Sequence, residues 1–315
     1  MSHSSQDKRR GWHWADYWRS GRDEVMTVGT PDGTASFDTG PFWRAWFASF
    51  PDGARLLDLA TGSGRVAGYA LQAGLAQARA YDITGIDYAE APRPLDGCTL
   101  LGEVALESLP FAAACFDGAS SQFGLEYADP HRALAELSRV LRPDGRVLML
   151  AHHADSVISR QAAAQLAAWD QVVGSGGALR QARRLFSAHL RAAPEAARAA
   201  AECGLREAVA RAAARLEPDP AFAPARYFVD YLTDLAGRSS AYEPASALAC
   251  LEAVEAGNAA WRQRQICQLR AALDPAGLDA FIARAQTVGL QCLEREPERH
   301  ADGALIGWRI ALRKA

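Results

Sequence analysis

The sequence predicts an α/β protein with a doubly wound, mostly parallel sheet, an antiparallel hairpin at the sheet edge and a large helical insertion. Short apolar runs alternate with helix-compatible segments from residue 51 to about residue 155. The chain then becomes continuously rich in Ala, Arg, Leu and Glu, which are good helix formers, to about residue 285. Two strand-like runs separated by a turn close the chain, and strands so close together favour a hairpin.

The first strand is expected at residues 55–60, where an apolar run leads into Thr61-Gly62-Ser63-Gly64, and a helix-compatible stretch follows to Gly74. Four further runs of strand length follow, at residues 81–86, 98–101, 117–123 and 146–151. An amphipathic helix at 131–141, closed by a turn at 142–145, separates the last two runs. Alternating strands and helices predict a parallel sheet that is covered by helices on both faces.

Outside this core, residues 51–155, the sequence predicts three further segments. Residues 1–50 form an aromatic-rich arm, in which Trp14, Tyr17 and Trp18 share one helical face; the arm either packs on the core or acts as a lid over a ligand. Residues 156–285 form the helical insertion, which is either a cap or an oligomerisation element that would support a homodimer. Residues 286–315 supply the final strands, at 291–296 and 304–312, which complete the core sheet.

Composition excludes several function classes. A chain that is 49% hydrophobic can bury a sizeable core, and a net charge of −3 provides no basic field for nucleic acid or an anionic membrane. No uninterrupted apolar stretch approaches the roughly 20 residues of a membrane span, and the N-terminus has no secretory signal pattern. The six cysteines are scattered without a CxxC pair, so we expect neither a disulfide framework nor a metal site. We therefore expect a cytoplasmic protein that acts on a small molecule.

The segment Gly62-Ser63-Gly64 lies where the first strand hands over to a helix. Glycines there allow a tight turn and a close approach of the backbone to a ligand, and the helix that follows offers unpaired N–H groups. Asp87 ends the next strand about twenty residues downstream, where a carboxylate would meet the ribose hydroxyls of a nucleotide.

A dinucleotide site is the rival interpretation, because residues 62–67 also satisfy the GxGxxG/A pattern, which is weak by itself. Asp58 argues against it, since it lies on the strand just before the turn. A carboxylate there would hinder a pyrophosphate but would favour S-adenosylmethionine (SAM), which carries an ammonium and a sulfonium.

Four motifs in series resemble those of class I SAM-dependent methyltransferases. LLDLATGSGRVA at residues 56–67 resembles the first motif of that family, and GIDYAEA at 85–91 resembles the second. LESLPFAAACFDGASSQFGLEY at 106–127 and LAELSRVLRPDGRVLML at 134–150 are similar to the following blocks of its ubiquinone-biosynthesis type. The resemblance covers about residues 54–151 and implies a Rossmann-like methyltransferase fold with a seven-stranded sheet.

The resemblance also implies a set of SAM-binding residues: Asp58, Ala60, Gly62, Ser63, Gly64, Asp87, Tyr88, Val104, Ala105, Gln122 and Phe123. By this resemblance, the glycine turn is expected to line the amino-acid portion of SAM, and Asp58 is expected to orient the groups around the ammonium of SAM. Asp87 would accept hydrogen bonds from the ribose and Tyr88 would flank the adenine. Relatives often read the adenine edge with an acidic residue where this chain has Ala105, so backbone groups of Val104 and Ala105, or Glu103, are expected to replace it. Ser121, Gln122 and Phe123, at the end of the fourth strand, would face the sulfonium and the acceptor.

Methyl transfer is an in-line displacement that needs a general base only when the acceptor is neutral and must lose a proton. The candidates are His152 and His153 after the fifth strand and Glu126 after the fourth, with Tyr127 and His13 behind them. Because successive strand residues point to opposite faces, we expect only one of the two histidines to reach the pocket.

Three hypotheses follow for the reaction. The first is methyl transfer from SAM to a small molecule with release of S-adenosylhomocysteine (SAH). The second is an enzyme of the same fold that uses SAM itself as substrate, for example by intramolecular cyclisation that releases methylthioadenosine. The third is a non-catalytic SAM-binding regulator.

Overall fold

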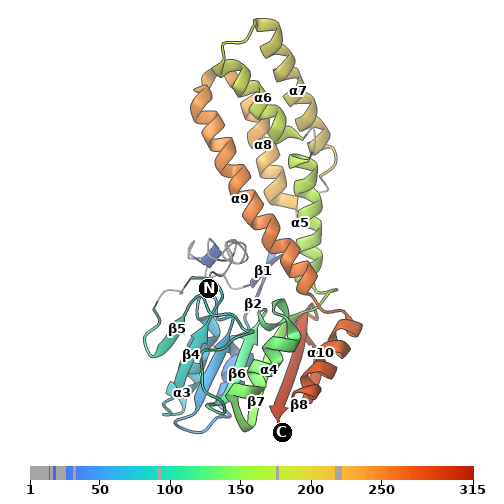
Figure 1. Cartoon of the computed structure of the whole chain (residues 1–315). Coiled ribbons are helices and arrows are strands. Elements are labelled where there is room, and N and C mark those ends of the chain that lie inside the picture. The colour runs from blue at the N-terminus through green and yellow to red at the C-terminus, as the bar shows by residue number, and fades with distance from the viewer. Residues whose placement is uncertain are drawn as a thin grey trace. The chain divides into compact units, whose positions relative to one another are not determined.

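A computed structural model describes residues 14, 17–18, 26–30, 33–90, 94–174, 177–216 and 222–315. The chain divides into two units (Figure 1). The first unit contains residues 1–27, 36–160 and 266–315, and the second contains residues 28–35 and 161–265.

The first unit contains a seven-stranded sheet with the order β5-β4-β3-β6-β7-β9-β8. Its strands are β3 (Arg55–Leu59), β4 (Asp82–Ile86), β5 (Cys98–Leu101), β6 (Phe116–Gln122), β7 (Leu141–His152), β8 (Leu290–Arg299) and β9 (Leu305–Lys314). Pairing is parallel from β5 through β7, whereas β9 runs antiparallel to both β7 and β8. This confirms the predicted fold class. The strand order reverses between β3 and β6, so the topological switch point lies there.

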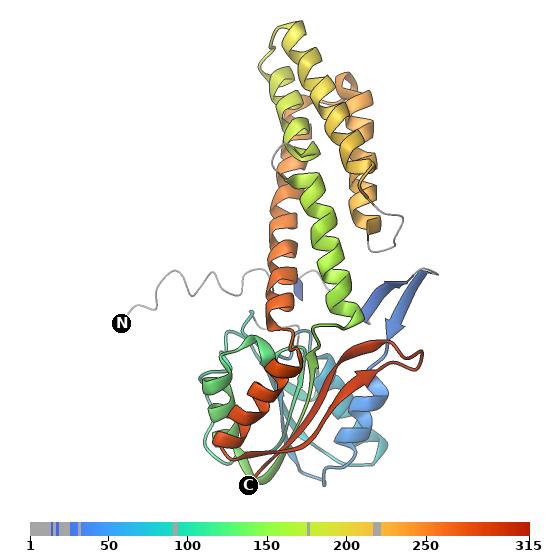
Figure 2. The same ribbon diagram turned by 90° about the vertical axis from the view of Figure 1, so that its right-hand side faces the viewer.

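Helices cover both faces of this sheet. Helices α2 (Gly40–Phe47) and α3 (Arg65–Ala76) lie on one face, and α4 (Pro130–Val140) and α10 (Pro275–Thr287) lie on the other (Figure 2). The sequence defines where α4 begins, because the Asp129 carboxylate accepts hydrogen bonds from the backbone N–H groups of His131 and Arg132.

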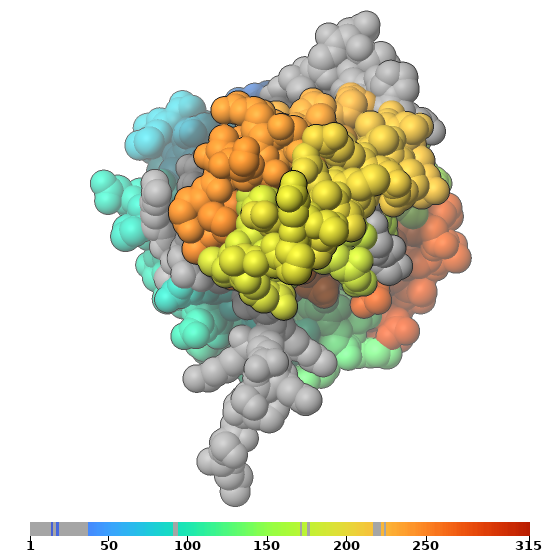
Figure 3. All heavy atoms as spheres, turned by 90° about the horizontal axis from the view of Figure 1, so that it is seen from above, coloured from blue at the N-terminus to red at the C-terminus, as the bar shows by residue number. Residues whose placement is uncertain are grey.

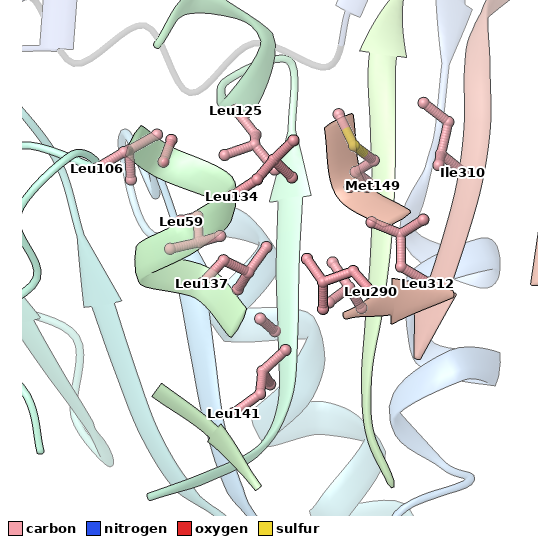
Figure 4. Packing of buried hydrophobic residues seen from close by; sticks show 14 of the residues in the cluster. Leu59, Leu106, Leu125, Leu134, Leu137, Leu141, Met149, Leu290, Ile310 and Leu312 are labelled. Carbon is pink, nitrogen blue, oxygen red and sulfur yellow. The ribbon is translucent and has the colours of Figure 1, made fainter. Parts of the chain in front are cut away.

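The core explains why the strands appear in the sequence as continuous apolar runs. Leu59, Leu134, Leu137, Met149 and Ile310 belong to one hydrophobic cluster between the sheet and the layer of α4 and α10 (Figure 4), and all are almost fully buried. A parallel strand between two helical layers buries both of its faces, so it carries no polar alternation. Each buried aliphatic side chain of this kind stabilises the fold by about 1.5–3 kcal/mol.

The turn expected at residues 142–145 does not precede the strand but lies within β7. Phe116 pairs with Leu141 and Gly118 pairs with Arg146, so the four residues between bulge out of the ladder. Asp144 adopts a φ of 60° there, which asparagine and aspartate tolerate better than most side chains. The turn residues were therefore predicted correctly, but the turn lies within the strand and does not precede it.

The second unit is mainly helical. Its helices are α5 (Val157–Val173), α6 (Ala178–Leu190), α7 (Glu195–Ala213), α8 (Ala223–Gly237), the short η4 (Ser239–Ala241) and α9 (Pro244–Ala271), of which α5 and α9 also contribute residues to the first unit. Leu185, Phe186, Leu232 and Leu251 are fully buried in its own hydrophobic cluster. Residues of α6, α7 and α9 form much of the surface seen in Figure 3.

Some boundaries differ from those that the sequence suggested. The insertion was expected to extend to residue 285, but α10 groups with the first unit, as does α2 from the expected N-terminal arm. The two-stranded sheet of β1 (Met26–Thr30) and β2 (Gly33–Phe37) was not predicted.

Within the described ranges, which include all six cysteines, there is no disulfide. No helix in this part of the chain combines the length and apolar character needed to cross a membrane. The same residues contain no group of three or more His, Cys, Asp or Glu side chains that could hold a metal ion.

Candidate functional site

The sheet order brings the predicted site residues to one edge. Leu59 of β3 is opposite Ile86 of β4 and Ser121 of β6, so the segments that leave these three strands start side by side. In open α/β sheets, ligands bind beyond the carboxyl ends of the strands at the switch point. The glycine turn follows β3, Asp87 and Tyr88 follow β4, and Phe123 follows β6.

The turn after β3 has left-handed backbone at three positions, with φ values of 53° at Ala60, 56° at Gly62 and 83° at Gly64. The Thr61 N–H donates to the Ile86 carbonyl at 2.8 Å, and the Gly64 N–H donates to the Thr61 carbonyl at 2.9 Å. Only glycine adopts this backbone without strain, so the turn requires Gly62 and Gly64, whereas Ala60 carries strain. Half-buried Ser63 lies between the two glycines.

Asp58 lies almost fully buried beneath this turn, with 2% of its surface exposed. Its carboxylate accepts hydrogen bonds from the Thr61 hydroxyl at 2.6 Å and from the Ser120 hydroxyl at 2.8 Å. Burial raises the pKa of Asp58 to about 6, although these hydroxyls favour the ionised form. Asp58 therefore connects the turn, through Thr61, to the neighbouring strand β6, through Ser120.

Asp87 ties the end of β4 to the glycine turn. Its Oδ2 accepts the Gly62 N–H at 2.8 Å, and its Oδ1 accepts the Ala89 N–H at 2.8 Å. Burial raises the pKa of Asp87, and these backbone donors oppose the rise. Each carboxylate oxygen has two lone pairs, so Asp87 keeps capacity to accept a ligand hydroxyl.

The residues expected around the adenine lie next to Asp87. Tyr88 is 43% exposed. The Val104 N–H donates to the Asp87 carbonyl at 2.9 Å, and the Ala105 carbonyl accepts the Ser108 N–H at 3.1 Å. The structure thus brings Tyr88 and Val104 to Asp87, while the Ala105 carbonyl is used within its own turn.

Gln122 and Phe123, at the end of β6, have different surroundings. The Gln122 Oε1 accepts hydrogen bonds from the Thr39 hydroxyl at 2.8 Å and from the Trp43 indole at 2.6 Å, so its carbonyl is used by the region of α2. Phe123 has a strained φ of 54°, and its ring centroid lies 4.3 Å from that of His152.

Glu126 and His152 form a buried pair at this edge, with Glu126 in the short helix η2 (Leu125–Tyr127). Their side chains are 0% and 6% exposed, and Glu126 Oε1 lies 2.8 Å from His152 Nδ1 and 2.9 Å from the His152 backbone nitrogen. Among the described residues, neither Glu126 Oε2 nor the Tyr127 hydroxyl has a hydrogen-bond partner, although both are buried. Such atoms are rare in proteins and mark a place where a polar ligand group would be accepted.

His153 has a different environment from His152. Its Nδ1 accepts the Asp155 N–H at 2.9 Å, and its ring stacks on Trp308 with centroids 4.3 Å apart. Burial lowers the pKa of His153. Of the two histidines, His152 is the one that contacts Phe123 and Tyr127 at the edge of the site.

Three aromatic residues of the N-terminal arm also reach this edge, and we call Trp14, Tyr17 and Trp18 the aromatic trio. A Cβ added to Gly62 would lie 2.6 Å from Trp18 Cζ2, so the Trp18 ring rests directly on the glycine turn. The Trp14 ring meets that of Tyr127 edge to face, 5.7 Å between centroids. Helical spacing indicated a shared face but could not indicate what that face contacts. His13 lies outside the described residues.

Comparisons with known proteins agree with the motifs. A methyltransferase domain family matches residues 57–149. The chain is 40% identical over 105 residues to the ubiquinone/menaquinone biosynthesis C-methyltransferase UbiE of Syntrophotalea carbinolica, covering 30% of this chain and 43% of that protein. It is 32% identical over 110 residues to the UbiE of Geobacter sulfurreducens, covering 31% and 42%. The chain therefore spans less than half the length of these two curated relatives.

Among solved structures, the chain is similar to the 1,6-didemethyltoxoflavin-N1-methyltransferase of Burkholderia thailandensis, with 14% identity, a TM-score of 0.46, and coverage of 100% of this chain and 92% of that one. The matched family and the named relatives are methyltransferases, and the family match lies within the α/β unit that contains the seven-stranded sheet. Residues 57–149 of this chain therefore match a methyltransferase domain family, and the chain resembles class I SAM-dependent methyltransferases of the ubiquinone-biosynthesis type.

Proposed function

We propose that this chain is an enzyme that transfers the methyl group of SAM to a small-molecule acceptor and releases SAH. The observation that carries the proposal is the buried Glu126–His152 pair at the same sheet edge as the glycine turn. The family of the α/β unit and the names of its relatives support the same chemistry.

The residues at this edge fit SAM. Gly62 and Gly64 keep the turn free of side chains, and buried carboxylates of Asp58 and Asp87 provide a negative environment for a cationic nucleoside. Glu126 Oε2 is a buried oxygen that lacks a hydrogen-bond partner among the described residues, as expected where the methyl acceptor, and not SAM, supplies the donor. We propose that Gly62, Ser63 and Gly64, with Ala60, hold the amino-acid portion, Asp87 the ribose, and Tyr88, Val104 and Ala105 the adenine. Gln122 and Phe123 are proposed to line the acceptor side.

His152 is the proposed general base. A carboxylate only accepts hydrogen bonds, so the proton at His152 Nδ1 faces Glu126 and the lone pair at Nε2 is available for a proton from the acceptor. When bound, SAM would supply a methyl group on a positively charged sulfur, which leaves with the bonding electron pair. Glu126 would stabilise the imidazolium that forms on His152. The surroundings of His153 suit a structural role better.

The remaining expectations stay predictions. We propose that the acceptor is a small molecule, that the helical unit closes over the acceptor or joins two copies of the chain, and that the protein works in the cytoplasm without a metal.

Binding of SAM can be tested without knowing the acceptor. Calorimetry should show SAM binding to the whole chain, and Asp87→Ala should weaken it by about 1–3 kcal/mol, the usual loss for a charge-assisted hydrogen bond. A protein that bound a nicotinamide or flavin cofactor in place of SAM would contradict the proposal.

The reaction can be tested by following SAH with a panel of phenols, amines and carboxylic acids. Glu126→Gln removes the carboxylate that orients His152, so it should lower the rate of SAH formation by up to about 10²–10⁴-fold, the usual contribution of a general base, while SAM affinity stays within about twofold. The matched control is Glu296→Gln, because Glu296 is 60% exposed and pairs with Arg309 on the sheet surface. Formation of methylthioadenosine without any acceptor would instead support SAM as its own substrate.

A further inference from the structure

The aromatic trio lies across the switch point of the sheet. The Trp18 ring rests on Gly62, in the turn after β3, and the Trp14 ring contacts Tyr127, in the segment after β6. Trp14 and Trp18 stack on each other with centroids 6.3 Å apart and ring planes 19° apart, and Tyr17 meets Trp18 at 4.8 Å. A ligand that lies on the glycine turn must therefore either contact the Trp18 ring or displace it.

The charged groups at this edge already have partners within the protein. Both oxygens of Asp58 accept hydroxyl hydrogen bonds, and both oxygens of Asp87 accept backbone N–H groups. Glu126 holds His152 through one oxygen, and only its Oε2 lacks a partner among the described residues. The partnered carboxylates therefore act on a ligand cation mainly as a negative environment, while the aromatic trio supplies ring faces that can contact the cation directly.

We propose that Trp14 and Trp18 form an aromatic wall that binds the sulfonium of SAM through the faces of their indole rings. The inference rests on the proposed SAM site, and it adds a way for the protein to discriminate between SAM, the methyl donor, and SAH, the product. Trp is the best aromatic partner for a cation, because the face of its π system is the most negative. SAM is a sulfonium cation, while SAH carries a neutral thioether, so the wall favours SAM and releases SAH after the reaction.

The test is the affinity of SAM and of SAH, measured by calorimetry on the full chain. Trp18→Leu keeps apolar bulk but removes the ring face, so SAM binding should weaken by roughly two- to thirtyfold, the range of a cation–π contact. SAH binding should change by less than about twofold, because SAH has no charge at sulfur. Trp18→Phe should recover part of the loss, and Trp14→Leu should show the same pattern as Trp18→Leu.

The matched control is Trp46→Leu in α2, since the Trp46 ring packs against Phe47 and Phe50 and has no described contact with the trio. It should leave both affinities unchanged, and thermal melting verifies that each variant is folded. Equal weakening of SAM and SAH by Trp18→Leu and Trp14→Leu would overturn the inference and leave the trio as an apolar cover. Absence of SAM binding in the unaltered chain would instead refute the proposed function itself.

Discussion

Replacing Asp58 by asparagine should make the folded protein more stable at neutral pH. Asp58 is buried, and burial raises the pKa of its carboxyl from 3.8 to about 6. At pH 7 it is therefore ionised in an environment that disfavours its charge. An asparagine amide can accept the hydrogen bond of one of the two hydroxyls and donate to the oxygen of the other, so it replaces the charge with a neutral group of the same shape.

The structure gives the size and the pH range of the effect. The difference between 3.8 and about 6 corresponds to about 3 kcal/mol at 1.36 kcal/mol per unit of pKa, as an order of magnitude. Because the folded-state pKa lies above the unfolded one, the folded state holds the extra proton between these values. Ionisation of Asp58 should therefore lower the free energy of unfolding of the unaltered protein as the pH rises from about 4 to about 6. Above that range this group should cause no further loss of stability.

The assay is urea unfolding of both proteins between pH 4 and pH 8. The advantage of Asp58→Asn should be near zero at pH 4, grow to at most about 3 kcal/mol near pH 6 and stay level above it. Asp82→Asn is the control, because the Asp82 side chain is 59% exposed, and its effect should stay within about 1 kcal/mol. A variant that is less stable than the parent at pH 8, or a difference that does not change with pH, would refute the reasoning. The variant should also bind SAM more weakly, since it removes negative charge beneath the turn.

Three further predictions concern backbone and packing. Gly62→Ala and Gly53→Ala both place a Cβ at positive φ, which should cost about 1–2 kcal/mol in urea unfolding, and Gly62→Ala should cost more because its Cβ would lie 2.6 Å from Trp18 Cζ2. Only Gly62→Ala should weaken SAM binding, by at least about tenfold, since nothing lies within 4 Å of a Cβ at Gly53. Gly124→Ala would bring its Cβ within 2.4 Å of the Ala60 Cβ and should destabilise the fold by about 1–3 kcal/mol; adding Ala60→Gly should recover most of this, and additive effects would contradict the clash. Leu251→Ala, at a fully buried position of the helical unit, should cost about 2–5 kcal/mol, and a loss under 1 kcal/mol would contradict its burial.

Local chemistry explains why much of the first unit could be predicted. The strand at residues 55–59 is a short apolar run because parallel strands bury both faces, and the turn after it needs glycine because its backbone is left-handed. The position of Asp87 at the end of the next strand follows from the same alternation of strand and helix. The motif series on these residues also predicted the methyltransferase domain that is matched at residues 57–149.

Contacts between segments that are distant in sequence could not be predicted from local sequence patterns. Strand alternation indicated that one of the two histidines faces the site, but only the packing of Glu126 against His152, and of Trp308 against His153, distinguishes them. Helical spacing showed that Trp14 and Trp18 share a face, whereas their contact with the glycine turn depends on how a separate segment packs.

The sequence by itself determined the alternating α/β order, the glycine turn and the acidic residue after the second core strand, because each depends on residues close together in the chain. Only the tertiary structure decided that β9 lies between β7 and β8, that Asp87 accepts the Gly62 N–H, and that Trp18 covers the turn. These pairings join residues far apart in sequence, and their partners are selected by mutual burial and hydrogen bonding in the folded protein.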